Sequence, residues 1–175
     1  MSNDARNLDV KMLHQAAEGG DADAQVRLAF ELMKGETVER DLYKAAHFYE
    51  LAARQGSTAA QHNLATMYLH GQGVESSKEL AIHWFTMAAE SNDIDAMFSL
   101  AMIYDEHDVF DDAIAWYQRA AESGSARAQY DLALIYHAGR GRPKDIDRAV
   151  FWYEKAAAQG VRRAEQALQL LTAQE

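Results

Sequence analysis

The chain has 175 residues, of which 49% are hydrophobic and 25% charged, a balance typical of a folded globular protein. It contains no cysteine, which excludes a disulfide-stapled fold, a thiolate nucleophile and a cysteine-ligated zinc site. Its formal net charge of −10 argues against nonspecific nucleic-acid binding, because such binding depends on lysine and arginine that neutralise phosphates. The sequence shows no signal-peptide pattern and no apolar run long enough for a membrane span. We therefore expect a cytoplasmic protein with neither a membrane nor a nucleic-acid partner.

Small residues followed by glycine or asparagine recur along the chain and divide it into equivalent segments. The segments end at Gly20, Gly56, Asn92, Gly124 and Gly160. Glycine, and after it asparagine, suits the left-handed conformation that ends many helices. Trp84, Trp116 and Trp152 also recur, at spacings of 32 and 36 residues, and each precedes a second aromatic residue. A period of this size indicates a solenoid of repeats.

The predicted elements follow this period in chain order. An N-terminal half repeat at residues 8–20 forms one cap helix; full repeats follow at 21–56, 57–92, 93–124 and 125–160; a closing half repeat occupies 161–175. Each full repeat holds a helix A, with segments such as AQHNLA, and a helix B, with the aromatic pair. Asp41, Ser77 and Asp145 lie where helix B should begin and suit an N-cap. The expected fold is a single all-α solenoid domain of about ten helices, in which hairpins bury their apolar faces against their neighbours.

The repeated residues also carry a family resemblance. The pattern is A-x-x-x-L-[GA]-x-x-Y, a loop G-x-G-V, then A-x-x-W-[FY]-x-x-A-A-x-x-G. It resembles the Sel-1-like repeat family, which is related to the tetratricopeptide repeats, and the resemblance covers residues 12–172. It implies a right-handed α/α superhelix that acts as a non-catalytic adaptor or scaffold in a bacterial protein, with a protein or peptide as partner.

The resemblance also implies candidate partner-binding positions, because helix A lines the concave face of tetratricopeptide-like superhelices. Counted two residues before and two after the family's leucine, they are Val26 and Phe30, His62 and Thr66, Phe98 and Met102, and Tyr130 and Leu134. This row of mainly aromatic and apolar side chains suits a peptide or helix bound in a groove. The alternative is that the same side chains only pack neighbouring A helices, because interiors and interfaces share a composition.

The third repeat holds an acidic stretch, YDEHDVFDD at residues 104–112, in a turn that has lost the G-x-G loop. Asp108 is placed to cap helix B, and Asp111 and Asp112 suit the first turn of that helix, where negative charge is favourable. Asp105 and Glu106 instead end helix A, where negative charge is unfavourable. They therefore join the candidate partner-binding residues, for a partner with basic residues.

Two kinds of motif invite a chemical role. Residues 71–73 and 139–141 read G-x-G, but no strand precedes them as it would in a dinucleotide-binding fold, so a helix end and turn is the simpler interpretation.

No two histidines are three or four residues apart, and the calcium-loop pattern is missing, so we expect neither a metal nor a cofactor. A hydrolase-like activity, linked with some cysteine-rich members of the family, is a remote alternative, since the chain has neither cysteine nor an S-x-x-K motif.

Charge is distributed unevenly along the chain. From Glu79 to Asp112 there are nine acidic residues and no lysine or arginine, whereas from His137 to Arg163 there are seven lysines and arginines against three acidic residues. Solvated faces explain such asymmetry, but opposite charges also join protein copies. The alternative function is therefore a self-assembling structural or regulatory subunit, a homo-oligomer that uses its end caps and charged faces.

Overall fold

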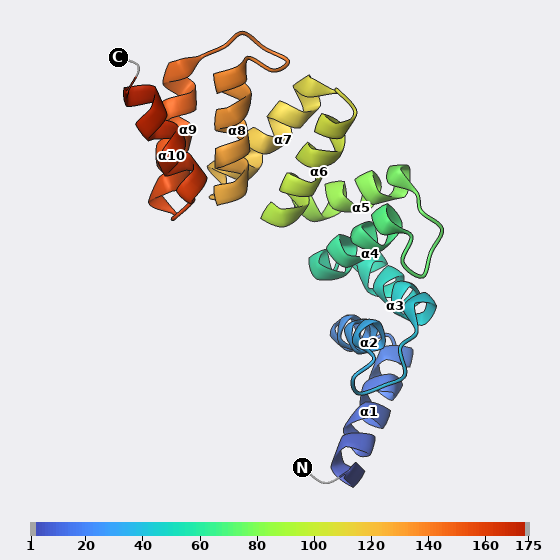
Figure 1. Ribbon diagram of the computed structural model, residues 1–175. Coiled ribbons are helices and arrows are strands. Elements are labelled where there is room, and N and C mark those ends of the chain that lie inside the picture. The colour runs from blue at the N-terminus through green and yellow to red at the C-terminus, as the bar shows by residue number, and fades with distance from the viewer. Residues whose placement is uncertain (1–2, 174–175) are drawn as a thin grey trace. The chain divides into compact units, whose positions relative to one another are not determined.

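The computed structural model describes residues 3–173, with side chains from residue 8, and in this range the chain forms ten α-helices and no strand (Figure 1). The helices are α1 (Asn3–Glu18), α2 (Ala22–Lys34), α3 (Leu42–Arg54), α4 (Thr58–His70), α5 (Lys78–Glu90), α6 (Ile94–Glu106), α7 (Phe110–Glu122), α8 (Ala126–Ala138), α9 (Ile146–Ala158) and α10 (Arg162–Thr172). The predicted all-α solenoid of about ten helices is thereby confirmed.

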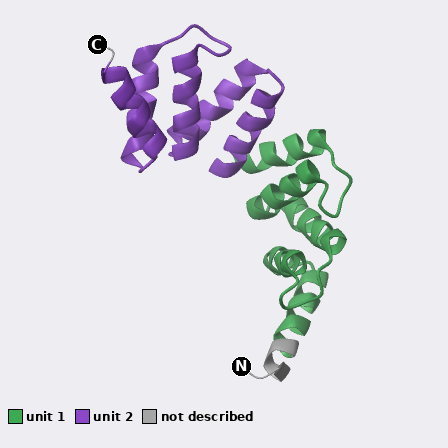
Figure 2. Cartoon of the chain, in the orientation of Figure 1, with its two compact units in different colours: residues 1–91 green, residues 92–175 purple. Residues whose placement is uncertain are grey.

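The chain forms two compact units, residues 1–91 and residues 92–175 (Figure 2). In the first unit, α1 to α5 pack in chain order, each helix against the next, and in the second unit α6 to α10 do the same. The division lies one residue before the predicted end of the second repeat. Each unit therefore contains helices of both kinds, with α2, α4, α6 and α8 as helix A and α3, α5, α7 and α9 as helix B.

Helix ends follow the local signals in the sequence. The side chains of Asp41, Ser77 and Asp145 each accept a backbone N–H three residues further on, at 2.9, 3.2 and 3.0 Å, so these predicted N-caps are confirmed. All five predicted left-handed residues have positive φ, from 65° at Asn92 to 97° at Gly124. Local backbone chemistry thus fixes where these helices begin and end.

Alanine and one aromatic residue per repeat form the cores. The helix A alanines Ala29, Ala65, Ala101 and Ala133 are fully buried, which allows helices to approach closely. Of each aromatic pair, the second member is the core residue: Tyr49, Phe85, Tyr117 and Tyr153 are at most 3% exposed. The tryptophans before them are only half-buried, because adjacent residues on a helix point about 100° apart.

The second glycine of each G-x-G loop is required by packing. Gly73 has φ of 71° and lies against the Leu42 carbonyl at the start of α3, and Gly141 has φ of 70° and lies against the Phe110 side chain at the start of α7. A Cβ atom at either position would overlap its neighbour. This structural role explains why the loops carry glycine without a phosphate ligand.

The prediction that Asp108 caps helix B is wrong. The residue before α7 is Val109, no side chain caps that helix end, and Asp108 itself has φ of 58°. The turn from α6 to α7 contains only residues 107–109, so Asp108 adopts the left-handed conformation that reverses the chain. An N-cap residue instead needs an extended backbone. Asp111 and Asp112 do lie in the first turn of α7, as predicted.

Candidate partner-binding site

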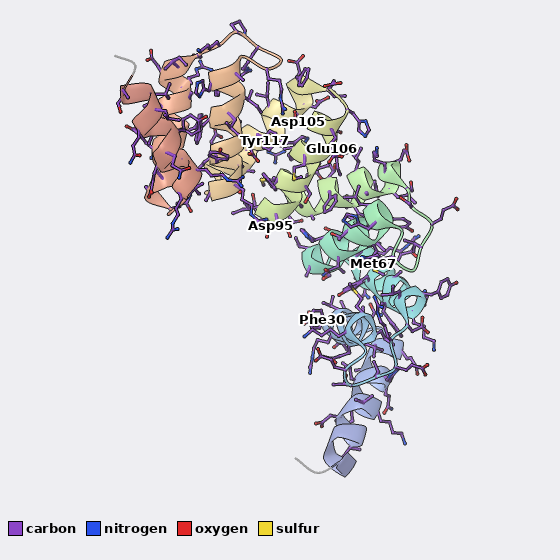
Figure 3. The ribbon with its side chains drawn as sticks, viewed as in Figure 1. Phe30, Met67, Asp95, Asp105, Glu106 and Tyr117 are labelled. Atoms are coloured by element: carbon purple, nitrogen blue, oxygen red, sulfur yellow. The ribbon has the colours of Figure 1, made fainter. Side chains whose placement is uncertain are left out.

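In the first unit, the four candidate residues lie in different environments. Val26 is half-buried and packs against the core, and the ring of His62 meets that of Phe85 edge-on at 5.5 Å. The Thr66 hydroxyl donates a hydrogen bond of 3.1 Å to the His62 carbonyl. Phe30, labelled in Figure 3, is 47% exposed. It is the large exposed apolar side chain of this group.

In the second unit, four of the six candidate residues line one hollow of about 570 Å³. These four are Phe98, Met102, Asp105 and Leu134. The other lining residues are Tyr117, Arg127, Asp131, Ile135, Ala138 and Arg140. The lining comes from α6, α7, α8 and the loop after α8, and we refer to it as the α6–α8 hollow.

The walls of the α6–α8 hollow are apolar and partly exposed. Phe98, Met102 and Asp105 are four and three residues apart on α6, so they share one face of that helix. Met102 is 42% exposed and Leu134, on α8, is 40% exposed. Phe98 meets Tyr117 edge-on, with ring centroids 5.8 Å apart. The hollow is therefore lined by large apolar side chains that are partly exposed and by the buried ring of Tyr117.

Its polar end is an ion pair between Asp105 and Arg140, both of which line the α6–α8 hollow. The Arg140 guanidinium donates to Oδ2 of Asp105, whose side chain is 16% exposed (Figure 3 labels Asp105 at the end of α6). Arg140 can reach α6 because Gly139 ends α8 in the left-handed conformation and turns the chain. The other oxygen, Oδ1, is buried and has no hydrogen-bond partner among the described residues. Asp105, predicted to meet a basic partner, thus already has a basic partner within its own chain.

A second carboxylate, Asp131 on α8, lies in the same hollow. It is half-buried, and across residues 8–173 it makes no side-chain hydrogen bond or ion pair. The pKa of Asp131 is raised to about 6. Burial is the main cause and repulsion from Asp105 adds to it, while attraction to Arg140 acts in the opposite direction. Burial also raises the pKa of the Tyr117 phenol, and the nearby charge of Asp131 adds to that effect. The negative charge of Asp131 is therefore held in the hollow at a cost.

The two remaining candidates do not line the α6–α8 hollow. The ring of Tyr130 lies 5.9 Å from that of Tyr153, so Tyr130 packs against helix B of its own repeat. Glu106 is exposed and lies one residue beyond Asp105 at the end of α6 (Figure 3). Counting from the leucine therefore identified the apolar walls of the hollow but also included residues that it does not contain.

Sequence reasoning missed Asp131 and Arg140. The signal for Asp131 was present, since the residue before the family's leucine is Arg27, Asn63 and Ser99 in the other copies and is acidic only here. Arg140 lies between the two glycines of a G-x-G motif, and that motif predicts only a helix end and a turn. Neither the ion pair nor the neighbouring free carboxylate follows from repeat spacing, because both depend on how α6, α8 and the loop meet.

Within residues 3–173, no helix is both long and apolar enough to cross a membrane. The same part of the chain contains no group of three or more histidine or acidic side chains arranged to hold a metal ion.

The fold and the hollow define a helical-repeat protein, in which consecutive helices pack in chain order within each unit. A family model described as Sel1 repeat matches residues 22–57, 58–93, 94–125 and 126–161. The chain therefore belongs to the Sel1 repeat family, as its repeated residues predicted. No match was found among curated proteins.

Solved structures agree with this assignment. The chain is 30% identical to c5321, a protective antigen from uropathogenic Escherichia coli with an SLR fold; the match has a TM-score of 0.84 and covers 94% of this chain and 36% of that one. It is 31% identical to a Sel1 repeat protein from Oxalobacter formigenes, with a TM-score of 0.76 and coverage of 91% and 73%. MamA, at 19% identity and a TM-score of 0.62, shares the fold alone, with 89% of each chain covered. This chain thus spans about a third of the c5321 structure and most of the Oxalobacter one.

Proposed function

We propose that this protein is a non-catalytic adaptor or scaffold that binds a peptide or helical segment of a partner protein in the α6–α8 hollow. Sel1 repeat proteins generally mediate protein–protein interaction. The observation that carries the proposal is the pair Met102 and Leu134, two large apolar side chains on different helices that are 42% and 40% exposed in one hollow. The relatives from Escherichia coli and Oxalobacter formigenes support a bacterial source, and the cytoplasm is the location that we propose for the protein.

The energetics of this pair favour a bound segment. Fully burying such a side chain contributes about 1.5–3 kcal/mol, so covering the exposed part of Met102 and of Leu134 would contribute about 1 kcal/mol each. Phe98 extends the same wall, and charged side chains line the hollow beside it. Apolar and charged groups side by side suit an anchor residue of a partner that carries both kinds of group.

The test is capture of the partner from a lysate of the native host. The double variant Met102→Ser, Leu134→Ser should lose the captured protein while it keeps the unfolding midpoint of the wild type. A matched control is Leu80→Ser, Met87→Ser on α5, whose side chains are 41% and 40% exposed and lie outside the hollow. The control should retain capture. Equal capture by a folded hollow variant would contradict the proposal.

Self-assembly through charged faces is the second candidate, and the uneven charge along the chain favours it. The ion pair of Asp105 with Arg140 already joins the acidic third repeat to the basic fourth repeat within one chain. Because these two charges are already paired within one chain, they contribute less to a contact between two copies. Mass measurement at low and high salt separates the candidates, since a monomer at both salt concentrations is incompatible with assembly through charge.

A further inference from the structure

We infer that the α6–α8 hollow binds a lysine or arginine side chain of the partner segment, next to an apolar residue, with the Asp131 carboxylate as the counter-ion. The inference rests on the proposed function and adds the chemistry of the segment that is bound. It is carried by the position of Asp131 and by the charges and walls around it.

The Asp131 carboxylate is partly shielded from solvent, and no hydrogen bond or ion pair within the described range replaces the lost hydration. It is half-buried in the lining of the hollow and makes no side-chain hydrogen bond or ion pair within the described range. Burying a charged group without a partner costs free energy, and the rise of its pKa to about 6 reflects the same cost. A cation from a bound segment would supply the missing counter-charge, so binding would recover what folding has lost.

None of the other charged groups that line the hollow forms an ion pair with Asp131 within the described range. Arg140 is engaged by Asp105, and the second oxygen of Asp105 has no partner in the described structure. Arg127 lies one turn before Asp131 on α8, is exposed, and forms no ion pair with it. Tyr117 is buried beneath and carries no charge at neutral pH, since burial raises its pKa further. An acidic segment would bring a third negative charge toward two carboxylates, whereas a basic one complements them.

The walls suit the rest of such a side chain. Lysine and arginine have long aliphatic stems that pack on apolar surface while the charged end reaches a polar group. Met102 and Leu134 provide that surface in the same hollow as Asp131. At the position of Asp131 the other copies carry arginine, asparagine and serine, so Asp131 is the carboxylate among these four equivalent positions.

Selection of random dodecapeptides displayed on phage, with the full chain immobilised, tests the inference. The wild type should enrich peptides with a lysine or arginine beside an apolar residue. For a fluorescein-labelled peptide from this pool, Asp131→Asn should weaken binding on the order of tenfold, the usual scale for a hydrogen bond to a charged group. Asp147→Asn changes the net charge equally at an exposed site on α9 and should leave the affinity unchanged. Replacing the peptide's cation by norleucine should give a loss similar to that of Asp131→Asn.

The outcomes separate this inference from the proposed function. Peptides that depend on Met102 and Leu134 but lack a cation, or that bind Asp131→Asn as well as the wild type, would overturn the inference alone. Failure to select any peptide that depends on those two residues would count against the proposed function and the inference together. An Arg127→Ala variant should bind equally or more tightly; a loss with Arg127→Ala and none with Asp131→Asn would assign the contact to an acidic group of the peptide.

Discussion

Nε2 of Gln159 donates a hydrogen bond of 2.8 Å to Oε1 of the buried Gln129. The Gln129 amide in turn donates to the Ala121 carbonyl at 3.0 Å, so one buried side chain links the ends of two successive B helices. Gln25 and Gln55 repeat the pair in the first unit, also at 2.8 Å. This polar link lies inside an otherwise apolar stack, where a satisfied amide fixes register.

The second repeat has lost half of this link. Gln61 donates to the Ala53 carbonyl at 3.2 Å, but its Oε1 is buried and has no partner among the described residues, because Ser91 occupies the position of Gln159. The backbone of Ser91 (φ −89°, ψ 19°) is close to that of Gln159 (φ −94°, ψ 9°). Ser91→Gln should therefore raise the free energy of unfolding by about 1 kcal/mol, measured by urea denaturation.

The reciprocal change in the first repeat is its control. Gln55→Ser removes an existing donor from Gln25 and should lower the free energy of unfolding by about 1 kcal/mol. If Ser91→Gln left stability unchanged while Gln55→Ser lowered it, the position of Gln61 would differ from that of its counterparts.

Two equivalent tyrosines make a second matched pair. Tyr49 and Tyr153 are both fully buried, and burial raises the pKa of each to about 12. The Tyr153 hydroxyl lies 3.2 Å from Nδ1 of His137, whereas the Tyr49 hydroxyl has no partner in the range that the structure describes. Tyr153→Phe should lower the free energy of unfolding by about 1 kcal/mol, while Tyr49→Phe should leave it unchanged or raise it. Thermal unfolding of the two variants checks this, and equal losses would show that the hydroxyls have equivalent environments.

Features that depend on a few adjacent residues were predictable from the sequence. The N-caps, the left-handed Asn92 and the hairpin order all follow from local backbone chemistry and periodicity. Asp108 shows the limit of this reasoning, because the shortened turn needs a left-handed residue more than it needs a cap. The environment of Asp131 could not be predicted from the sequence. It depends on the contact of Arg140, in the loop after α8, with Asp105 on α6, and on the burial that the hollow between the helices provides.

The left-handed conformation of Asp108 has a stability consequence. A residue with a Cβ pays about 1 kcal/mol at φ of 58°, and glycine does not. Asp108→Gly should therefore raise the free energy of unfolding by about 0.5–1 kcal/mol in urea denaturation. Asp111→Gly, in the first turn of α7, should instead lower it, because glycine is unfavourable within a helix. A loss of stability with Asp108→Gly would show instead that the Asp108 side chain stabilises the turn by more than its left-handed backbone costs.

The raised pKa of Asp131 predicts how stability depends on pH. Its pKa is about 6 in the folded state against an ordinary 3.8, so between these values the folded protein holds a proton that the unfolded chain has released. The contribution of Asp131 to the free energy of unfolding therefore falls as pH rises through this window. Asp131→Asn should stabilise the protein at pH 7.5 by about 1 kcal/mol, a value reduced for partial solvent exposure, and the gain should vanish near pH 4. Asp147→Asn is the control, and a gain for Asp131→Asn that persisted at low pH would rule out the ionised carboxylate as its cause.

Asp105 and Asp131 are coupled energetically through Arg140. Arg140 is the counter-ion of Asp105 and also offsets the charge of Asp131, so Arg140→Ala leaves two carboxylates to repel each other in one hollow. It should lower the free energy of unfolding by about 1–2 kcal/mol at pH 7.5, and by about 0.5–1 kcal/mol less when Asp131 is already asparagine. Urea denaturation of the four proteins of this double-mutant cycle measures the difference.

An exposed ion pair provides the scale for that measurement. Arg54 and Glu50 are one turn apart on α3, with Nη2 and Oε1 2.6 Å apart and side chains 68% and 35% exposed. Because water screens such a pair, Arg54→Ala should cost no more than about 0.5 kcal/mol. If Arg140→Ala cost as little, or if its effect were the same with and without Asp131→Asn, Arg140 would not be the residue that allows both carboxylates to share the hollow.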